Sequence, residues 1–440
     1  MKKHTSFKFT LPLFKFLKGY KRKDLLADTK AGANVALLDF PQGMAYAMIA
    51  GLPVNFGIYS SAIGSILGSS RFLMLGPTNA SAVLLLSGFL SLNWPEASRI
   101  AAMPLLLLMI AAIMIAGALI RADIVIRYVS RSVVTGYVSA AAMLIIINQL
   151  RPALAIEAPR AATFWESLIA ILQNINTFSP AALTLSAGTI VIALALKRWL
   201  KSIPYVAVTL GLATLATWFA KDHGYVLETL QAVPAGRWPI SIPTFSLPQI
   251  HDLLGVAFAI AFLSLLESAS IAKALASQAG DTVDIRQQMI SMGVADAVNA
   301  IGSGMPVSGS LTRSTLNYNS GARSPISSLT SGIILVAGAL LLGPIIGYIP
   351  KGALAIGDFA RLAGERGIHV IIGGAMPEFM QVLTNTGVVE AMGPENIFPH
   401  TPENVTLSTR YALKRAQSLL GVSSADILLF GKKVDSSSLA

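Results

Sequence analysis

The sequence contains no cysteine and few charged residues. Without cysteine, disulfide bonds and thiol redox chemistry are excluded. Charged residues make up 12% of the 440 residues and hydrophobic residues 54%, whereas a typical soluble domain carries about twice that share of charge. Apolar runs of bilayer-spanning length recur. The composition indicates an all-α polytopic membrane protein, because a spanning segment must satisfy its backbone hydrogen bonds internally.

Signatures of catalysis and secretion are also absent from the sequence. It has five histidines, with no cluster of metal ligands, no nucleophile–base pair and no phosphate-binding loop. We therefore expect neither an enzyme nor a bound cofactor. The N-terminus lacks the short apolar region and the small-residue cleavage site of a secretory signal.

Acidic residues are scarce, and the net charge is +11. A nucleic-acid partner is one explanation, but residues 1–23 hold eight Lys and Arg and no acid, directly before the first apolar run. This pattern favours a basic cytoplasmic N-terminus that is attracted to anionic membrane lipid. No nucleic-acid partner is predicted.

Eleven apolar segments are predicted to span the membrane, with the N-terminus in the cytoplasm. Alternation then places the short basic connections inside, as the positive-inside rule requires. The longer connections 151–178 and 221–249 fall outside, and residues 163–175 have the amphipathic pattern of a helix on the membrane surface. The predicted spans are residues 30–50, 53–69, 72–92, 99–120, 124–148, 180–198, 203–220, 251–275, 285–303, 304–320 and 325–349.

The sequence changes character after residue 355. Residues 356–420 have the pattern of a soluble α/β piece, with a helix, a short apolar strand and a second helix. Residues 421–440 are expected to be a disordered tail. An odd number of spans would leave the soluble piece outside the cell.

Two polar stretches interrupt the apolar spans, LGPTNASAV (75–83) and GMPVSGSLTRS (304–314). Each places a proline, Pro77 or Pro306, before small and hydroxyl residues, and proline is well tolerated where a helix begins. Each therefore predicts an extended segment followed by a helix that starts within the membrane. The two helices would approach from opposite sides, so that their N-termini meet and attract an anion. Two ordinary proline kinks are the alternative.

Ionisable residues within spans are candidate functional groups. Glu267 lies mid-span, and because burial disfavours a charged carboxyl group it could carry a proton, or it could be held by serines for structure. Arg313 could attract an anion, pair with Glu267, or extend its side chain to the membrane–water interface. Asp39 faces a cavity or a polar junction. Gln42 can donate hydrogen bonds, and Pro41 is expected to break the helix beside it.

Four motifs, residues 41–59, 68–83, 267–276 and 304–325, resemble the SulP sulfate-permease family of anion transporters. The resemblance covers about residues 20–355, and residues 356–420 resemble the second half of the family's cytoplasmic STAS domain. It implies a seven-plus-seven inverted repeat, the fold of uracil permeases. Spans 12–14 and the first STAS strands have no counterpart, so the second repeat would be incomplete. Restoring three spans would return the STAS piece to the cytoplasm.

The resemblance also implies an organisation of the chain. Residues 24–120 would form core spans 1–4, residues 121–249 gate spans 5–7, and residues 250–355 core spans 8–11. The core would move against the gate as an elevator, and the gate would form a homodimer interface. The implied anion-binding residues are Gln42, Tyr46, Pro77, Thr78, Asn79, Ala80, Ser308, Gly309, Ser310, Leu311, Thr312 and Arg313. Glu267 takes the position linked to the coupling ion, and Asp39, acidic where the family is expected to be apolar, is a second candidate for that role.

The predicted function is a secondary active transporter of small anions in the inner (plasma) membrane. Sulfate, bicarbonate and dicarboxylates would all suit the site, with H⁺ or Na⁺ symported. A uracil- or xanthine-type permease is one alternative, although span 10 lacks the acid that such proteins use. A non-transporting membrane sensor or scaffold that acts through the STAS-like part is the other.

Overall fold

The computed structural model describes residues 20–121, 146–159, 163–199, 205–222, 228–233 and 236–355, and four short strands beyond them. The chain divides into two compact units, Met1–Arg361 and Leu362–Ala440. This boundary lies close to the predicted change of character at residues 355–356. Most of residues 1–23, of the span 124–148 and of the STAS-like piece lie outside the described residues.

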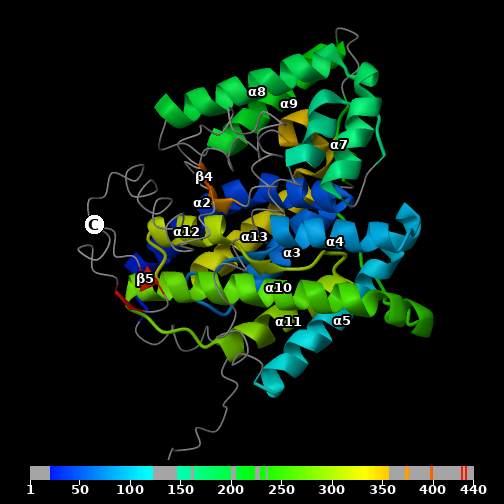
Figure 1. The fold of residues 1–440 in the computed structure, drawn as a ribbon. Coiled ribbons are helices and arrows are strands. Elements are labelled where there is room, and N and C mark those ends of the chain that lie inside the picture. The colour runs from blue at the N-terminus through cyan, green and yellow to red at the C-terminus, as the bar shows by residue number, and fades with distance from the viewer. Residues whose placement is uncertain are drawn as a thin grey trace, which may run out of the picture. The chain divides into compact units, whose positions relative to one another are not determined.

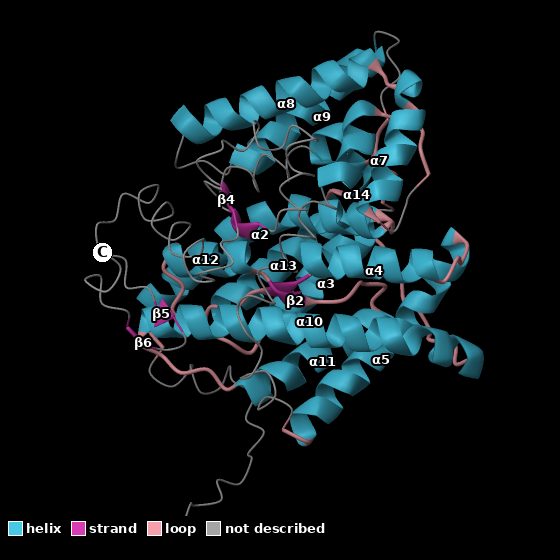
Figure 2. Ribbon diagram, viewed as in Figure 1, coloured by secondary structure: helices cyan, strands magenta, loops and turns pink. Residues whose placement is uncertain are grey.

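The first unit is helical (Figures 1 and 2). Two short strands, β1 (Leu75–Gly76) and β2 (Ser308–Gly309), interrupt the helices where the two proline motifs lie. The helices are α2 (Arg22–Ala50), α3 (Val54–Leu67), α4 (Asn79–Ser91), α5 (Glu96–Leu119), α7 (Phe164–Gln173), α8 (Pro180–Trp199), α9 (Tyr205–Asp222), α10 (Leu247–Ala279), α11 (Ile285–Ile301), α12 (Leu311–Asn319), α13 (Ile326–Leu341) and α14 (Gly343–Ile346), with a 3₁₀ turn η2 (Ile175–Thr177).

The predicted spans agree with these helices wherever the structure describes them. α4 and α12 are shorter than the apolar segments that contain them, because the first part of each segment is extended, as the proline motifs predict. By length and composition, α5 and α10 alone among the described helices could cross a bilayer, and several others are shorter apolar helices. One expectation is wrong: α2 continues through Pro41. Helices in a membrane tolerate an internal proline where neighbouring elements pack around it.

The packing of the first unit has an internal two-fold character. The helices α2, α3, α4 and α5 correspond in order to α10, α11, α12 and α13. Under this correspondence, the contact of α5 with α11 matches the contact of α13 with α3, and the contact of α2 with α13 matches the contact of α10 with α5. The contacts α2–α12 and α10–α4 match in the same way. Figure 1 shows α10 beside α11 and α5. These eight helices have the arrangement expected of the core of an inverted repeat.

Contacts between the connections separate into two groups that match the two sides of the predicted topology. On the side predicted to be outside, the backbone N–H of Leu230 donates to the carbonyl of Ile349 at 2.9 Å. On the opposite side, the backbone N–H of Arg323 donates to Asp28 at 2.6 Å, and Ser291 donates to the carbonyl of Leu67. Which side is cytoplasmic stays a prediction.

The amphipathic segment 163–175 contains a helix, as predicted. α7 buries Ser167 and Ile171 and exposes the apolar side chains of Trp165, Ile169 and Leu172. An exposed apolar face suits a helix that lies at a membrane surface.

The second unit contains described strands only. β3 (Ile372–Ala375) pairs in parallel with β4 (Ile397–Pro399), which is compatible with the predicted α/β pattern because parallel strands need a crossover connection. β5 (Leu428–Leu429) pairs antiparallel with β6 (Lys432–Lys433). These four residues lie within the predicted tail 421–440, whose disorder stays a prediction.

Candidate functional site

The two proline motifs meet at an antiparallel strand pair. Leu75 lies opposite Gly309 and Gly76 opposite Ser308, and the backbone N–H of Ser310 donates to the carbonyl of Met74 at 3.1 Å. Residues more than 200 positions apart are thus joined through their backbones. Because the strands are antiparallel, the helices that follow them leave in opposite directions. The paired half-helices predicted from the sequence are confirmed.

Hydroxyl side chains cap both half-helices. Thr78 accepts a hydrogen bond from the backbone N–H of Ser81 at the start of α4, and Ser310 accepts one from the backbone N–H of Arg313 at the start of α12. A side-chain cap satisfies one of the N–H groups that a helix leaves without an intrahelical partner. The N-terminal amides and the helix dipole give each end a partial positive charge, which favours an anion nearby.

Glu267 on α10 links the two motifs. Its Oε2 accepts a hydrogen bond from the Thr78 hydroxyl at 3.1 Å and another from the Ser308 hydroxyl at 2.8 Å. The neighbouring Ser268 hydroxyl accepts the backbone N–H of Gly309 at 2.7 Å. The Glu267 carboxylate therefore joins the two motifs through their hydroxyl groups.

The carboxylate partner of Arg313 is Asp39, and not Glu267. Both side chains are fully buried, and Nη1 of Arg313 bonds to Oδ1 of Asp39. Nη2 of Arg313 donates to the carbonyl of Pro77 at 2.6 Å, and the Ser61 hydroxyl donates to Asp39 at 2.8 Å. The ion pair therefore connects α12 with α2, α3 and the residue before the α4 cap. Asp39 thus lies at a polar junction within the protein, one of the two positions expected for it.

A glycine makes room for the Arg313 guanidinium. A Cβ added to Gly76 would lie 2.5 Å from Nη1 of Arg313 and 3.1 Å from its Cζ. The guanidinium therefore lies directly against the backbone of β1. Its charge is close to both half-helix N-termini, although Asp39 balances it.

The remaining candidate residues lie around this junction. Gln42 and Tyr46 are buried on α2, three and seven residues after Asp39, so all three share one helix face. Leu311 is half-exposed at the start of α12. Asn79, Ala80 and Thr312 belong to the first turns of α4 and α12. Their contact with an anion stays a prediction.

The sequence reasoning missed one buried acid, Asp296 on α11. It is fully buried, and its carboxylate accepts the backbone N–H of Val307 at 3.0 Å, which fixes the extended segment before β2. Asn299, one turn later, is fully buried as well. The criterion that singled out Glu267, an acid in an apolar span, would have found Asp296.

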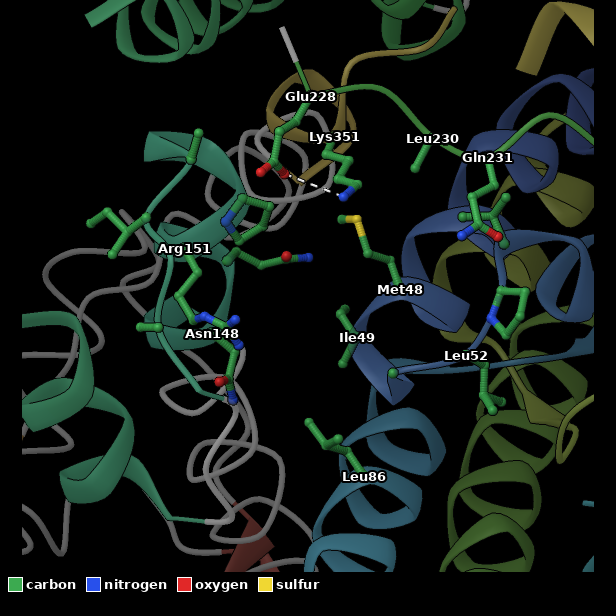
Figure 3. A pocket seen from close by; sticks show the side chains of 18 of the residues that line it. Met48, Ile49, Leu52, Leu86, Asn148, Arg151, Glu228, Leu230, Gln231 and Lys351 are labelled. Atoms are coloured by element: carbon green, nitrogen blue, oxygen red, sulfur yellow. Dashed lines mark hydrogen bonds and ion pairs between the residues drawn. The ribbon is translucent and has the colours of Figure 1, made fainter. Parts of the chain in front are cut away.

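A cavity of about 550 Å³ opens among the connections of the predicted outer side. Figure 3 shows Asn148 and Arg151 on one wall, Met48, Ile49 and Leu86 on the opposite wall, and an ion pair between Lys351 and Glu228. The Met48 wall belongs to α2, just beyond Tyr46, and Leu86 belongs to α4. The cavity therefore borders the outer ends of two helices that carry site residues.

Two half-helices that start from a shared strand pair, with an internal acid between them, are an arrangement typical of membrane proteins built from inverted repeats. The sequence pattern of the sulfate permease family matches residues 25–356. The chain belongs to this family.

Relatives and solved structures agree with this assignment. Sulfate transporter 4.1, chloroplastic, of Arabidopsis thaliana is 31% identical over 375 residues, covering 80% of this chain and 53% of its own length. Human solute carrier family 26 member 6 is 26% identical over 386 residues, covering 80% of this chain and 50% of its own length. The chain thus spans about half the length of these relatives.

Two solved structures have the same fold. The transmembrane domain of the cyanobacterial bicarbonate transporter BicA has a TM-score of 0.72 at 19% identity, covering 85% of this chain and 96% of that domain. The murine anion transporter Slc26a9 in its inward-facing state has a TM-score of 0.75 at 21% identity, covering 95% of this chain and 70% of the other.

Proposed function

We propose that the protein binds a small anion between the N-termini of α4 and α12 and carries it across the membrane. The observation that carries this proposal is the pairing of β1 with β2, which brings two capped helix N-termini together. Two partial positive charges suit a sulfate, bicarbonate or dicarboxylate ion. The names of relatives, sulfate transporters and a bicarbonate transporter, support the same class of substrate.

Glu267 links the anion to a cation. An ionised carboxylate between the two motifs repels an anion, whereas a proton or a bound Na⁺ removes that repulsion. Thr78 and Ser308 donate to the same carboxylate oxygen, so a change at Glu267 reaches both motifs. Cation and anion therefore bind together, and the protein is a symporter.

The outer cavity supplies the path to the site from outside. Its lining includes the cations Arg151 and Lys351 and the end of α2 beyond Tyr46, together with the carboxylates of Glu96, Glu157 and Glu228. Movement of the core helices as an elevator would then carry the anion to the other side. A homodimer and a location in the inner (plasma) membrane belong to the same proposal.

The test is uptake of labelled sulfate, bicarbonate, succinate and chloride into proteoliposomes, with and without inward H⁺ and Na⁺ gradients. Binding of the same anions to the detergent-solubilised chain is measured in parallel by calorimetry, because binding does not require the complete transport cycle. We expect one gradient to drive uptake of one anion. In Glu267→Gln, a neutral side chain of similar shape, uptake should no longer depend on that gradient.

Two results would contradict the proposal. Uptake by Glu267→Gln that depends on the gradient as strongly as in the unmodified protein would refute the role of Glu267. Binding of uracil or xanthine, with no binding of any anion, would favour the nucleobase permease. The family match gives that alternative no support.

A further inference from the structure

We propose that Asp39 prevents an anion from binding without the coupling cation, because it cancels the charge of Arg313. This inference rests on the proposed function and adds a residue that sets the anion affinity of the cation-free state. Asp39 does so without binding the cation itself.

The geometry of the ion pair carries the argument. Arg313 and Asp39 are both fully buried, so solvent does not screen their charges from the neighbouring helix ends. Arg313 also donates to the carbonyl of Pro77, directly before the α4 cap Thr78, and it lies in the first turn of α12. An anion between these two helix ends would therefore experience both members of the pair.

The summed charge of Asp39, Arg313 and Glu267 explains the expected effect on anion affinity. With Glu267 ionised, Asp39, Arg313 and Glu267 sum to one negative charge, which disfavours an anion. A cation at Glu267 brings the sum to zero. Without Asp39, the sum would be zero with Glu267 ionised and one positive charge with a cation at Glu267. An anion could then bind before the cation. Asp39 thereby excludes binding of the anion alone.

Other ionisable side chains on the packed elements do not alter this comparison. Among the described residues these include Asp296 on α11, Tyr59 on α3 and Tyr318 on α12, together with charged residues near the helix ends. They are unchanged in the variants considered below, so they contribute equally to each measurement.

The chain offers a matched control on the same helix. Asp28 is also fully buried on α2, but it accepts hydrogen bonds from Tyr20, from Ser324 and from the backbone N–H of Arg323. It lies eleven residues, or about 16 Å along a helix, from Asp39. Asp28→Asn therefore makes the same chemical change away from the two helix ends.

The experiment measures binding of sulfate, bicarbonate, succinate and chloride to the full chain by calorimetry. Conditions are pH 8 without Na⁺, pH 8 with Na⁺, and pH 6 without Na⁺, all at one ionic strength. In the unmodified protein, we expect the cation or the lower pH to tighten binding by about tenfold or more, since a unit charge has that effect even at about 10 Å in a protein interior. In Asp39→Asn, binding without the cation should itself tighten by about tenfold or more, because the charge sum is then already zero. Asp28→Asn should keep the unmodified affinity without the cation.

A double variant separates charge balance from direct cation binding. Asp39→Asn with Arg313→Gln returns the charge sum to one negative charge, so binding without the cation should be weaker than in Asp39→Asn alone, and the cation should still tighten it. If Asp39 were itself the cation ligand, the cation would not tighten binding to the double variant. This tightening is measured within the double variant, so it holds even if Asp39→Asn alone fails to fold.

Each outcome has a distinct meaning. Unchanged affinity without the cation in folded Asp39→Asn, or no tightening by the cation in the double variant, overturns the inference and leaves the proposed function intact. If the unmodified protein binds none of sulfate, bicarbonate, succinate and chloride under any condition, the proposed function fails instead.

Discussion

The buried ion pair between Arg313 and Asp39 leads to a prediction about stability. Arg313→Gln leaves the Asp39 carboxylate with the Ser61 hydroxyl as its remaining donor, because the guanidinium is gone. Breaking a fully buried pair costs about 3–5 kcal/mol of unfolding free energy, since one charge stays desolvated. Asp39→Asn should cost slightly less, because the amide oxygen can still accept from Arg313. The double variant should cost only about 1 kcal/mol, as a lost neutral hydrogen bond does.

A double-mutant cycle measures this coupling by reversible unfolding in mixed detergent micelles, followed by tryptophan fluorescence. The expected coupling free energy is at least about 4 kcal/mol, because the two single losses sum to more than about 5 kcal/mol and the double variant loses about 1 kcal/mol. The pair between Arg323 and Asp24 is the control, because Arg323 is half-exposed, and its coupling should be much smaller. A double variant whose loss equals the sum of the two single losses would show that the two side chains do not stabilise each other.

Two further predictions concern packing and pH. Gly57→Ala would place a Cβ 1.8 Å from the carbonyl oxygen of Gly43, so the α2–α3 contact must open, at a cost of about 1–3 kcal/mol or more. Gly255→Ala on α10 meets nothing within 4 Å and should gain about 0.5–1 kcal/mol in the same unfolding assay; equal effects of the two changes would contradict the packing. The pKa of Asp24, before the first predicted span, is lowered mainly by the hydrogen bond from the backbone N–H of Lys21. Its charged form therefore stabilises the folded state near neutral pH, and this contribution is lost as the pH falls through the lowered pKa, below 3.8. Stability curves of Asp24→Asn and the unmodified protein should converge there, and a constant difference would contradict the assignment.

Local patterns predicted the half-helix pair because each rests on adjacent residues. A proline followed by hydroxyl residues within an apolar run specifies an extended segment and a capped helix, and both caps, Thr78 and Ser310, came from these motifs. Helix positions followed from apolar length alone. These features need no knowledge of the partner segment.

Pairings across the fold could not be predicted in the same way. Asp39 and Arg313 are 274 positions apart, and no periodicity relates them, so Glu267 was an equally reasonable partner. Pro41 illustrates another limit, because a residue's own preference to break a helix yields to the elements packed around that helix. Tertiary packing decided both cases.

The proposed function requires an anion to bind between the N-termini of α4 and α12. A structure determined with selenate, whose anomalous signal identifies the anion, in the presence of the coupling cation would locate this site. We expect a selenate within hydrogen-bond distance of backbone amides in the first turns of both helices, close to Gln42 and Thr312. A well-occupied selenate in the outer cavity, with none between the two helix ends, would contradict the proposed function.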